Sequence, residues 1–154
     1  MTFNISLSSA GYGEVLSQTF SCDGKDVSPE ITWQDPPASS KSYILIMEDT
    51  DVRHGPLVHW VMYNIKANAN QIPENIPASE TTPEGWAQGL NGFGRLGYSG
   101  PCPHGKKVHR YNFTLYALNV SPELPSGLKK HDLTKIISDR TVKQASVMVR
   151  YGRS

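Results

Sequence analysis

The chain has 154 residues, of which 38% are hydrophobic and 19% charged, and it carries a formal net charge of +1. These values fit one soluble domain, residues 1–154, that buries its own core, and the lack of a basic cluster excludes nucleic acid as an expected partner. Because the sequence has no leader-like start and no run of about 18 apolar residues, we expect a cytoplasmic protein that is not embedded in a membrane.

Strands dominate the expected secondary structure, since 13 Gly and 11 Pro favour turns and strands over a helix bundle. Alternation of apolar and polar residues predicts strands over residues 3–7 and 15–20. Residues 42–48 and 57–65 are apolar on both faces, as is typical of central strands that are covered on two sides. Residues 109–118 alternate again and predict a further strand.

The segment between residues 76 and 108 is rich in Pro, Gly, Ser and Asn. Loops of this length are uncommon in compact domains unless they carry function, so we expect the functional site here. After Asp132, a predicted N-cap, Leu133, Ile136 and Ile137 recur at helical spacing and predict one helix. Residues 146–151 predict the last strand.

Five polar side chains lie where the predicted central strands begin or end. Asp49 and Asp51 end one strand on a common face, His59 lies in the next, and His109 and Tyr111 begin the strand after the long loop. Each has an ordinary explanation alone, such as a turn aspartate or a core histidine with a partner. Their convergence at three strand ends predicts a pocket.

Such a pocket can bind a small anion although it contains carboxylates. A carboxylate that accepts a hydrogen bond from one ring nitrogen raises the proton affinity of His59, and of His109 as well, so that the imidazolium donates outward. Tyr111 adds a hydroxyl donor, and the backbone N–H groups of residues 100–105 can form an anion-binding nest. The carboxylates can also accept a proton from a phosphate or a ligand ammonium.

The two cysteines, Cys22 and Cys102, stand far apart in the sequence and outside any Cys-x-x-Cys motif. In a reducing compartment this pattern favours two free thiols. A disulfide or a shared site stays open, because both cysteines fall in loops that we place at the same end of the molecule.

Ordered motifs along the chain resemble those of the phosphatidylethanolamine-binding family, which includes the Raf kinase inhibitor proteins and plant flowering-time regulators. The motifs are Cys-Asp-Gly-Lys-Asp-Val-Ser-Pro-Glu-Ile-Thr-Trp at 22–33, Asp-Thr-Asp at 49–51, His-Trp-Val-Met-Tyr-Asn at 59–64, Gly-Pro-Cys-Pro at 100–103 and His-Arg-Tyr at 109–111. The short chain and the Gly-Pro-Cys-Pro motif are similar to the bacterial and archaeal branch.

The resemblance implies a mainly β fold, a β-sandwich with a central sheet, a long pocket loop and one helix near the C-terminus. It implies non-enzymatic binding of a small anionic or phosphorylated ligand without cofactor or metal, a kinase or protease as the target, and a homodimer. The implied ligand-binding residues are Asp49, Asp51, His59, Gly100, Pro101, Cys102, His109 and Tyr111.

Two departures from the family pattern stand beside the pocket. Val52 and Arg53 follow the aspartates where the family usually has Ala-Pro, which allows Arg53 or His54 to reach the rim. His104 replaces a proline of the pocket loop and adds a titrating donor.

Two other classes of function compete with ligand binding, a hydrolase of either the metal or the serine type and a protease inhibitor. A metal-dependent hydrolase has suitable donors among these histidines and aspartates but lacks a His-Glu-x-x-His motif, and a serine hydrolase lacks a Gly-x-Ser-x-Gly elbow. A protease inhibitor would act through an exposed loop, and the pocket would then be dispensable.

Overall fold

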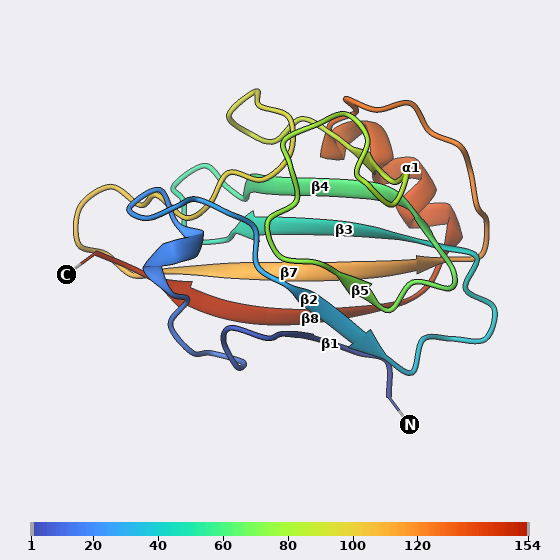
Figure 1. The fold of residues 1–154 in the computed structure, drawn as a ribbon, viewed down its shortest axis with the longest axis horizontal. Helices are drawn as coiled ribbons and strands as arrows, with labels where there is room; N and C mark the ends of the chain where they lie inside the picture. Colours follow the sequence, from blue (N-terminus) through green and yellow to red (C-terminus); the bar gives the residue numbers. More distant parts are fainter. Residues whose placement is uncertain (1, 154) are drawn as a thin grey trace.

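The computed structural model describes residues 2–153 as two antiparallel sheets and one α-helix (Figure 1). The small sheet has the order β1-β2-β5, with bounds Asn4–Leu7, Ile31–Gln34 and Gln71–Ile72. The large sheet has the order β6-β4-β3-β7-β8, with bounds Ala87–Gln88, Leu57–Lys66, Ser42–Asp49, His109–Leu118 and Thr141–Tyr151. The helix α1 is Lys130–Arg140. The predicted mainly β fold with one helix near the C-terminus is confirmed.

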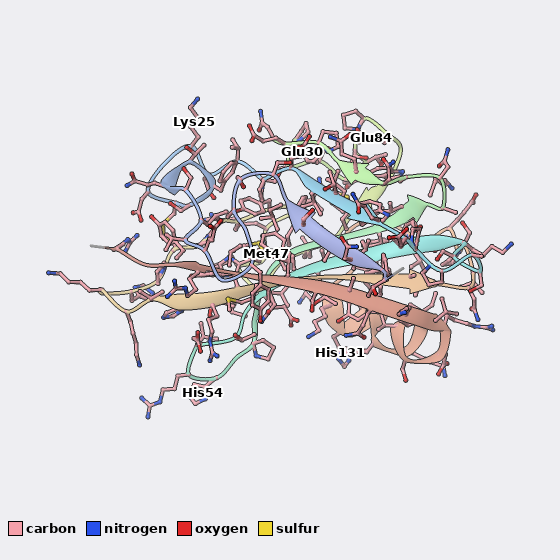
Figure 2. All side chains as sticks on the ribbon, turned by 90° about the horizontal axis from the view of Figure 1, so that it is seen from below. Lys25, Glu30, Met47, His54, Glu84 and His131 are labelled. Carbon is pink, nitrogen blue, oxygen red and sulfur yellow. A yellow bond between two sulfur atoms is a disulfide. The ribbon has the colours of Figure 1, made fainter. Side chains whose placement is uncertain are left out.

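The elements form three layers, with the small sheet on one face of the large sheet and α1 on the other (Figure 2). The main core lies between the sheets, where Met47 is buried, and it includes Ile5 of β1 and Trp33 of β2. A second apolar cluster joins the outer face of the large sheet to Leu133 of α1. As the sequence pattern predicts, burial of apolar side chains on both faces of the large sheet is the main source of folding stability.

The strand β3 is buried on both faces, as its continuous apolar sequence predicts. Tyr43, Leu45 and Met47 pack into the core between the sheets. Ile44 and Ile46 point the other way and pack into the cluster beneath α1. Since neighbouring residues of a strand face opposite sides, only a strand covered on both faces can be apolar at every position.

The strand predicted over residues 15–20 was wrong. Val15 makes a single parallel bridge to Arg150, and Gln18–Phe20 form a short 3-10 helix. The hydroxyl of Ser17 accepts a hydrogen bond from the Thr19 N–H, a local bond that competes with sheet pairing. The residues before this 3-10 helix form backbone hydrogen bonds with β8 and cover part of its free edge.

The C-terminal boundaries also differ from the predicted ones. Lys129 occupies the N-cap of α1, and Asp132 stands three residues further on, where its carboxylate accepts the Lys129 N–H. The last strand begins at Thr141 directly after the helix, five residues before its predicted start at Ser146. Its first residues are mostly exposed and carry no apolar alternation, so the pattern could not reveal them.

The end of β3 and the starts of β4 and β7 meet at one end of the large sheet, at the left of Figure 1. Asp49 is paired in register with Leu57 on β4 and with Tyr111 on β7. The loops around Cys22 and Cys102 lie at the same end. Among residues 2–153, no helix is long and apolar enough to cross a membrane.

Candidate functional site

A cavity of about 80 Å³ opens at this end of the large sheet, and we call it the histidine cavity. Four predicted site residues line it, namely Asp49, His59, Cys102 and His109. They come from the end of β3, from β4, from the loop after residue 76 and from the start of β7. The predicted convergence of strand ends with the proline-glycine loop is therefore seen in the structure.

Asp49 holds His109 rather than His59. The Asp49 side chain is 3% exposed, and its Oδ2 lies 2.6 Å from Nδ1 of His109. Because a carboxylate at this distance accepts a hydrogen bond, Nδ1 of His109 carries a proton, and the ring orientation is fixed. Two aligned strands supply the pair, since β3 and β7 are hydrogen-bonded neighbours.

His59 makes a different contact from the predicted one. Its Nδ1 lies 2.6 Å from the carbonyl oxygen of Ser99, which can only accept, so Nδ1 is the protonated nitrogen. Burial lowers the pKa of His59 below its ordinary value of 6.5, against the opposing effect of the Ser99 carbonyl. His59 is therefore a neutral ring near pH 7, whereas we had predicted an imidazolium.

The second ring nitrogen of His59 is left without a partner. Nε2 is buried, and no group among residues 2–153 forms a hydrogen bond with it. In the neutral tautomer with a proton on Nδ1, Nε2 is an acceptor. Buried polar atoms normally find partners, so this nitrogen marks a place for an outside donor.

Tyr111 lies behind the two histidines rather than on the cavity wall. Its ring stacks on His109 at a centroid distance of 6.4 Å and meets His59 edge to face at 5.3 Å. The side chain is fully buried, and its hydroxyl makes no hydrogen bond of normal geometry in the described part of the chain, although it lies close enough to the Asp49 carboxylate for that group to act on its pKa. Burial raises the pKa of Tyr111, and the charge of Asp49 raises it further, so the hydroxyl stays protonated and can donate.

Asp51 faces away from the histidine cavity. Its carboxylate forms a two-point ion pair with Arg110, in which Oδ2 accepts Nε at 3.0 Å and Oδ1 accepts Nη2 at 2.7 Å. The predicted shared face with Asp49 assumed that the strand continues, but β3 ends at Asp49. There Oδ1 of Asp49 accepts the Asp51 N–H at 2.9 Å and turns the chain.

The Asp51 ion pair predicts a stability difference that is present above the ordinary aspartate pKa of 3.8 and is lost in strong acid. Hydrogen bonds from Arg110 lower the pKa of Asp51 from 3.8 to about 2, so the folded state gains stability above the unfolded value that is lost as pH falls through about 2. The Asp51→Asn variant should be slightly less stable than the wild type at about pH 6, and the gap should close in acid. Urea unfolding of both proteins at about pH 6 and in acid measures the difference in the free energy of unfolding. A difference of unchanged size in acid would contradict the role of the Asp51–Arg110 ion pair.

Gly100 and Pro101 support the cavity wall from behind. The Gly100 N–H donates to Oδ1 of Asp26 at 2.7 Å, so it is not free to form the predicted anion nest. A Cβ at Gly100 would stand 2.1 Å from the Phe20 carbonyl oxygen, which explains why the position needs glycine. The Pro101 carbonyl oxygen accepts the Cys22 N–H at 3.1 Å and joins the two loops.

Cys22 and Cys102 form a disulfide with an S–S distance of 2.04 Å, so the predicted free thiols were wrong. The two residues are 80 positions apart in the sequence, and their Cα atoms lie 5.4 Å apart in space. Sequence spacing over such a distance does not reveal a pairing, and only the shared end of the fold pointed to it.

The remaining cavity walls are largely apolar. They come from Val52, Leu57, Phe93, Pro103 and His104. Phe93 is 45% exposed, and its ring meets His59 edge to face at a centroid distance of 5.2 Å. Nothing in the sequence distinguished Leu57 from an ordinary strand residue.

The two departures from the family pattern both touch the cavity. His104 borders it, as we expected, and so does Val52, whereas Arg53 and His54 are not among its lining residues. Figure 2 shows His54 on the loop between β3 and β4, away from the sheets. Within residues 2–153, no three His, Cys, Asp or Glu side chains gather as a metal site.

Comparisons with known proteins show the family of the chain. The family model of the phosphatidylethanolamine-binding protein matches residues 7–152. A UPF0098 protein of Aquifex aeolicus is 41% identical over 92% of this chain and 83% of its own length, and one of Methanothermobacter thermautotrophicus is 37% identical over 90% and 91%.

Solved structures show the same fold. A phosphatidylethanolamine-binding protein homologue from Chlamydia trachomatis is 30% identical, with a TM-score of 0.89 over 99% of both chains. YbcL of Escherichia coli, described as a member of the mammalian family, is 27% identical, with a TM-score of 0.91 over 100% of both chains. The chain belongs to the phosphatidylethanolamine-binding protein family, in its bacterial and archaeal type.

Proposed function

We propose that the histidine cavity binds, without catalysis, the acidic head group of a small ligand that brings its own hydrogen-bond donor. Family membership supports ligand binding in general. The observation that carries the proposal is the pair of buried atoms without partners, Nε2 of His59 and the hydroxyl of Tyr111. An acceptor on the cavity wall and a donor whose ring packs against the two histidines of that wall are thus both left without a partner.

The size of the cavity limits what it can hold. Its volume of about 80 Å³ is enough for a few water molecules, each of about 30 Å³ in the liquid, or for one phosphoryl or carboxyl group. A larger ligand would leave its remainder outside, where the exposed ring of Phe93 offers apolar contact. A phosphorylated head group fits this arrangement better than a whole lipid.

The protonation states decide which acids can bind. Neutral His59 can only accept at Nε2, so the ligand must carry a P–OH or an ammonium group, or His59 must take up a proton when the ligand binds. The Tyr111 hydroxyl can donate to an unprotonated oxygen. Lone pairs and donors then match at both atoms.

This proposal predicts proton uptake when a phosphate monoester binds. Free phosphate monoesters lose their second proton near pH 6. At about pH 8 the free ligand is therefore a dianion, and Nε2 of His59 carries no proton. Binding of phosphoethanolamine should then take up about one proton, and affinity should fall roughly tenfold per pH unit above that value. Calorimetry in two buffers of different ionisation enthalpy measures both quantities.

Matched variants and a second probe complete the test. His59→Gln should abolish the proton uptake, whereas His54→Gln, an exposed histidine outside the cavity, should leave it unchanged (Figure 2). Glycerophosphoethanolamine, a diester without a P–OH, should bind only if the ammonium group is the donor. Absence of heat for both probes at millimolar concentration would reject the proposal.

The wider role follows from family resemblance alone. Inhibition of a kinase or a protease, a homodimer and the absence of enzymatic activity stay predictions. The cytoplasmic location also stays a prediction, and the disulfide does not support it, because such bonds are more common in oxidising compartments.

A further inference from the structure

The Cys22–Cys102 disulfide lies in two exposed loops and touches a cationic side chain. Both cysteines are exposed, so a small molecule can reach the bond from solvent. Nη2 of Arg153 lies 3.2 Å from Sγ of Cys22 and 3.4 Å from Sγ of Cys102. One guanidinium nitrogen therefore contacts both sulfurs.

Two further contacts hold this guanidinium against the sulfurs. Nε of Arg153 donates to Oδ2 of Asp23 at 3.0 Å, and Nη1 donates to the carbonyl oxygen of Pro103 at 3.0 Å. The carboxylate is thus bound at the Nε edge, and Nη2 is left for the disulfide. Because the guanidinium group is planar and rigid, the two hydrogen bonds at Nε and Nη1 fix the position of Nη2 beside the sulfurs.

We propose that the Cys22–Cys102 disulfide is a thiol–disulfide exchange site, and that its opening by a small thiol reductant releases the loop that walls the histidine cavity. The reductant thiolate attacks one cysteine sulfur and forms a mixed disulfide, while the S–S bond breaks and its electron pair leaves on the other sulfur. A second reductant thiol then displaces the first. The protein gains two electrons and two protons as two thiols, and the reductant becomes its disulfide.

Arg153 accelerates the first step because it contacts whichever sulfur leaves. A cation beside a sulfur stabilises the thiolate, and a more stable thiolate leaves faster in the exchange. The contact therefore gives Arg153 a role beyond its ion pair.

Opening of the bond acts on the cavity because Cys102 is part of the wall. The disulfide is the covalent connection between this loop and the loop around Cys22. The other anchors include single hydrogen bonds, such as Gly100 N–H to Asp26 at 2.7 Å and Arg153 Nη1 to Pro103 at 3.0 Å. This coupling does not depend on which ligand the cavity takes.

The test compares the rate of disulfide reduction in two variants that each lose one arginine near the C-terminus. Dithiothreitol attacks as an anionic thiolate, and each variant loses one positive charge, so the change in net charge is the same in both. Arg153→Gln should slow reduction at about pH 7.5 by threefold or more. Arg150→Gln is the matched control, since that guanidinium donates to the Gly13 carbonyl oxygen at 2.7 Å, and its rate should equal the wild-type rate.

Hydrogen exchange of the reduced protein tests the second half of the proposal. Amide exchange in residues 100–105 should become at least tenfold faster after reduction, with the large sheet unchanged. Equal reduction rates in the two arginine variants would overturn the role of Arg153, and this comparison does not require the reduced chain to fold. Unchanged exchange in the loop, or faster exchange throughout the chain, would overturn the local release.

Discussion

Replacement of both Cys22 and Cys102 by serine should lower the free energy of unfolding by about 4 kcal/mol. The cross-link joins residues 80 positions apart, so it removes much of the conformational freedom of the unfolded chain. The folded state should keep its sheets, because the core between them contains neither cysteine. Urea unfolding of the wild type and the double variant gives the difference.

A reductant provides the internal control for this measurement. The wild type unfolded in excess dithiothreitol should approach the stability of the serine variant, and the variant itself should not respond to the reductant. A loss below about 1 kcal/mol would mean that the unfolded chain is already constrained near these loops, which the loop-entropy model does not include.

The central strands could be predicted well from the sequence because a strand that is buried on both faces has apolar residues at nearly every position. β3 and β4 each extend one residue beyond the ranges expected from their apolar runs. The two-residue strands β5 and β6 could not be predicted, since a pair of residues carries no periodicity. Their positions depend on pairing with β2 and β4.

The meeting of Asp49, His59 and His109 could be predicted, but the hydrogen bonds among them could not. Strand order and the strand ends bring the side chains to one place. Which oxygen accepts from which ring depends on shifts of about an ångström and on loop carbonyls such as that of Ser99. Burial makes His59 a neutral ring rather than the predicted cation, and the contact of Nδ1 with Ser99 leaves Nε2 as an acceptor, which changes the kind of ligand that fits.

The Tyr111→Phe variant should separate the needs of the cavity from the needs of the fold. The buried hydroxyl of Tyr111 has no partner, and an unsatisfied buried group costs about 1–3 kcal/mol. Its removal keeps the ring against His59 and His109 and should raise the free energy of unfolding by about 1 kcal/mol. Binding of phosphoethanolamine should weaken roughly tenfold, because one donor is lost.

Tyr63→Phe is the matched control, because Tyr63 is equally buried but fully bonded. Its hydroxyl donates to the Pro125 carbonyl oxygen at 2.6 Å and accepts the Leu128 N–H at 3.0 Å. This variant should lose about 1–2 kcal/mol of stability and keep its affinity. If the free energy of unfolding rises in Tyr111→Phe and falls in Tyr63→Phe, the fold tolerates an unsatisfied hydroxyl at the place where a ligand supplies its hydrogen-bond partner. If both variants lose stability alike, the Tyr111 hydroxyl has a partner in the folded protein, and its assignment to the ligand fails.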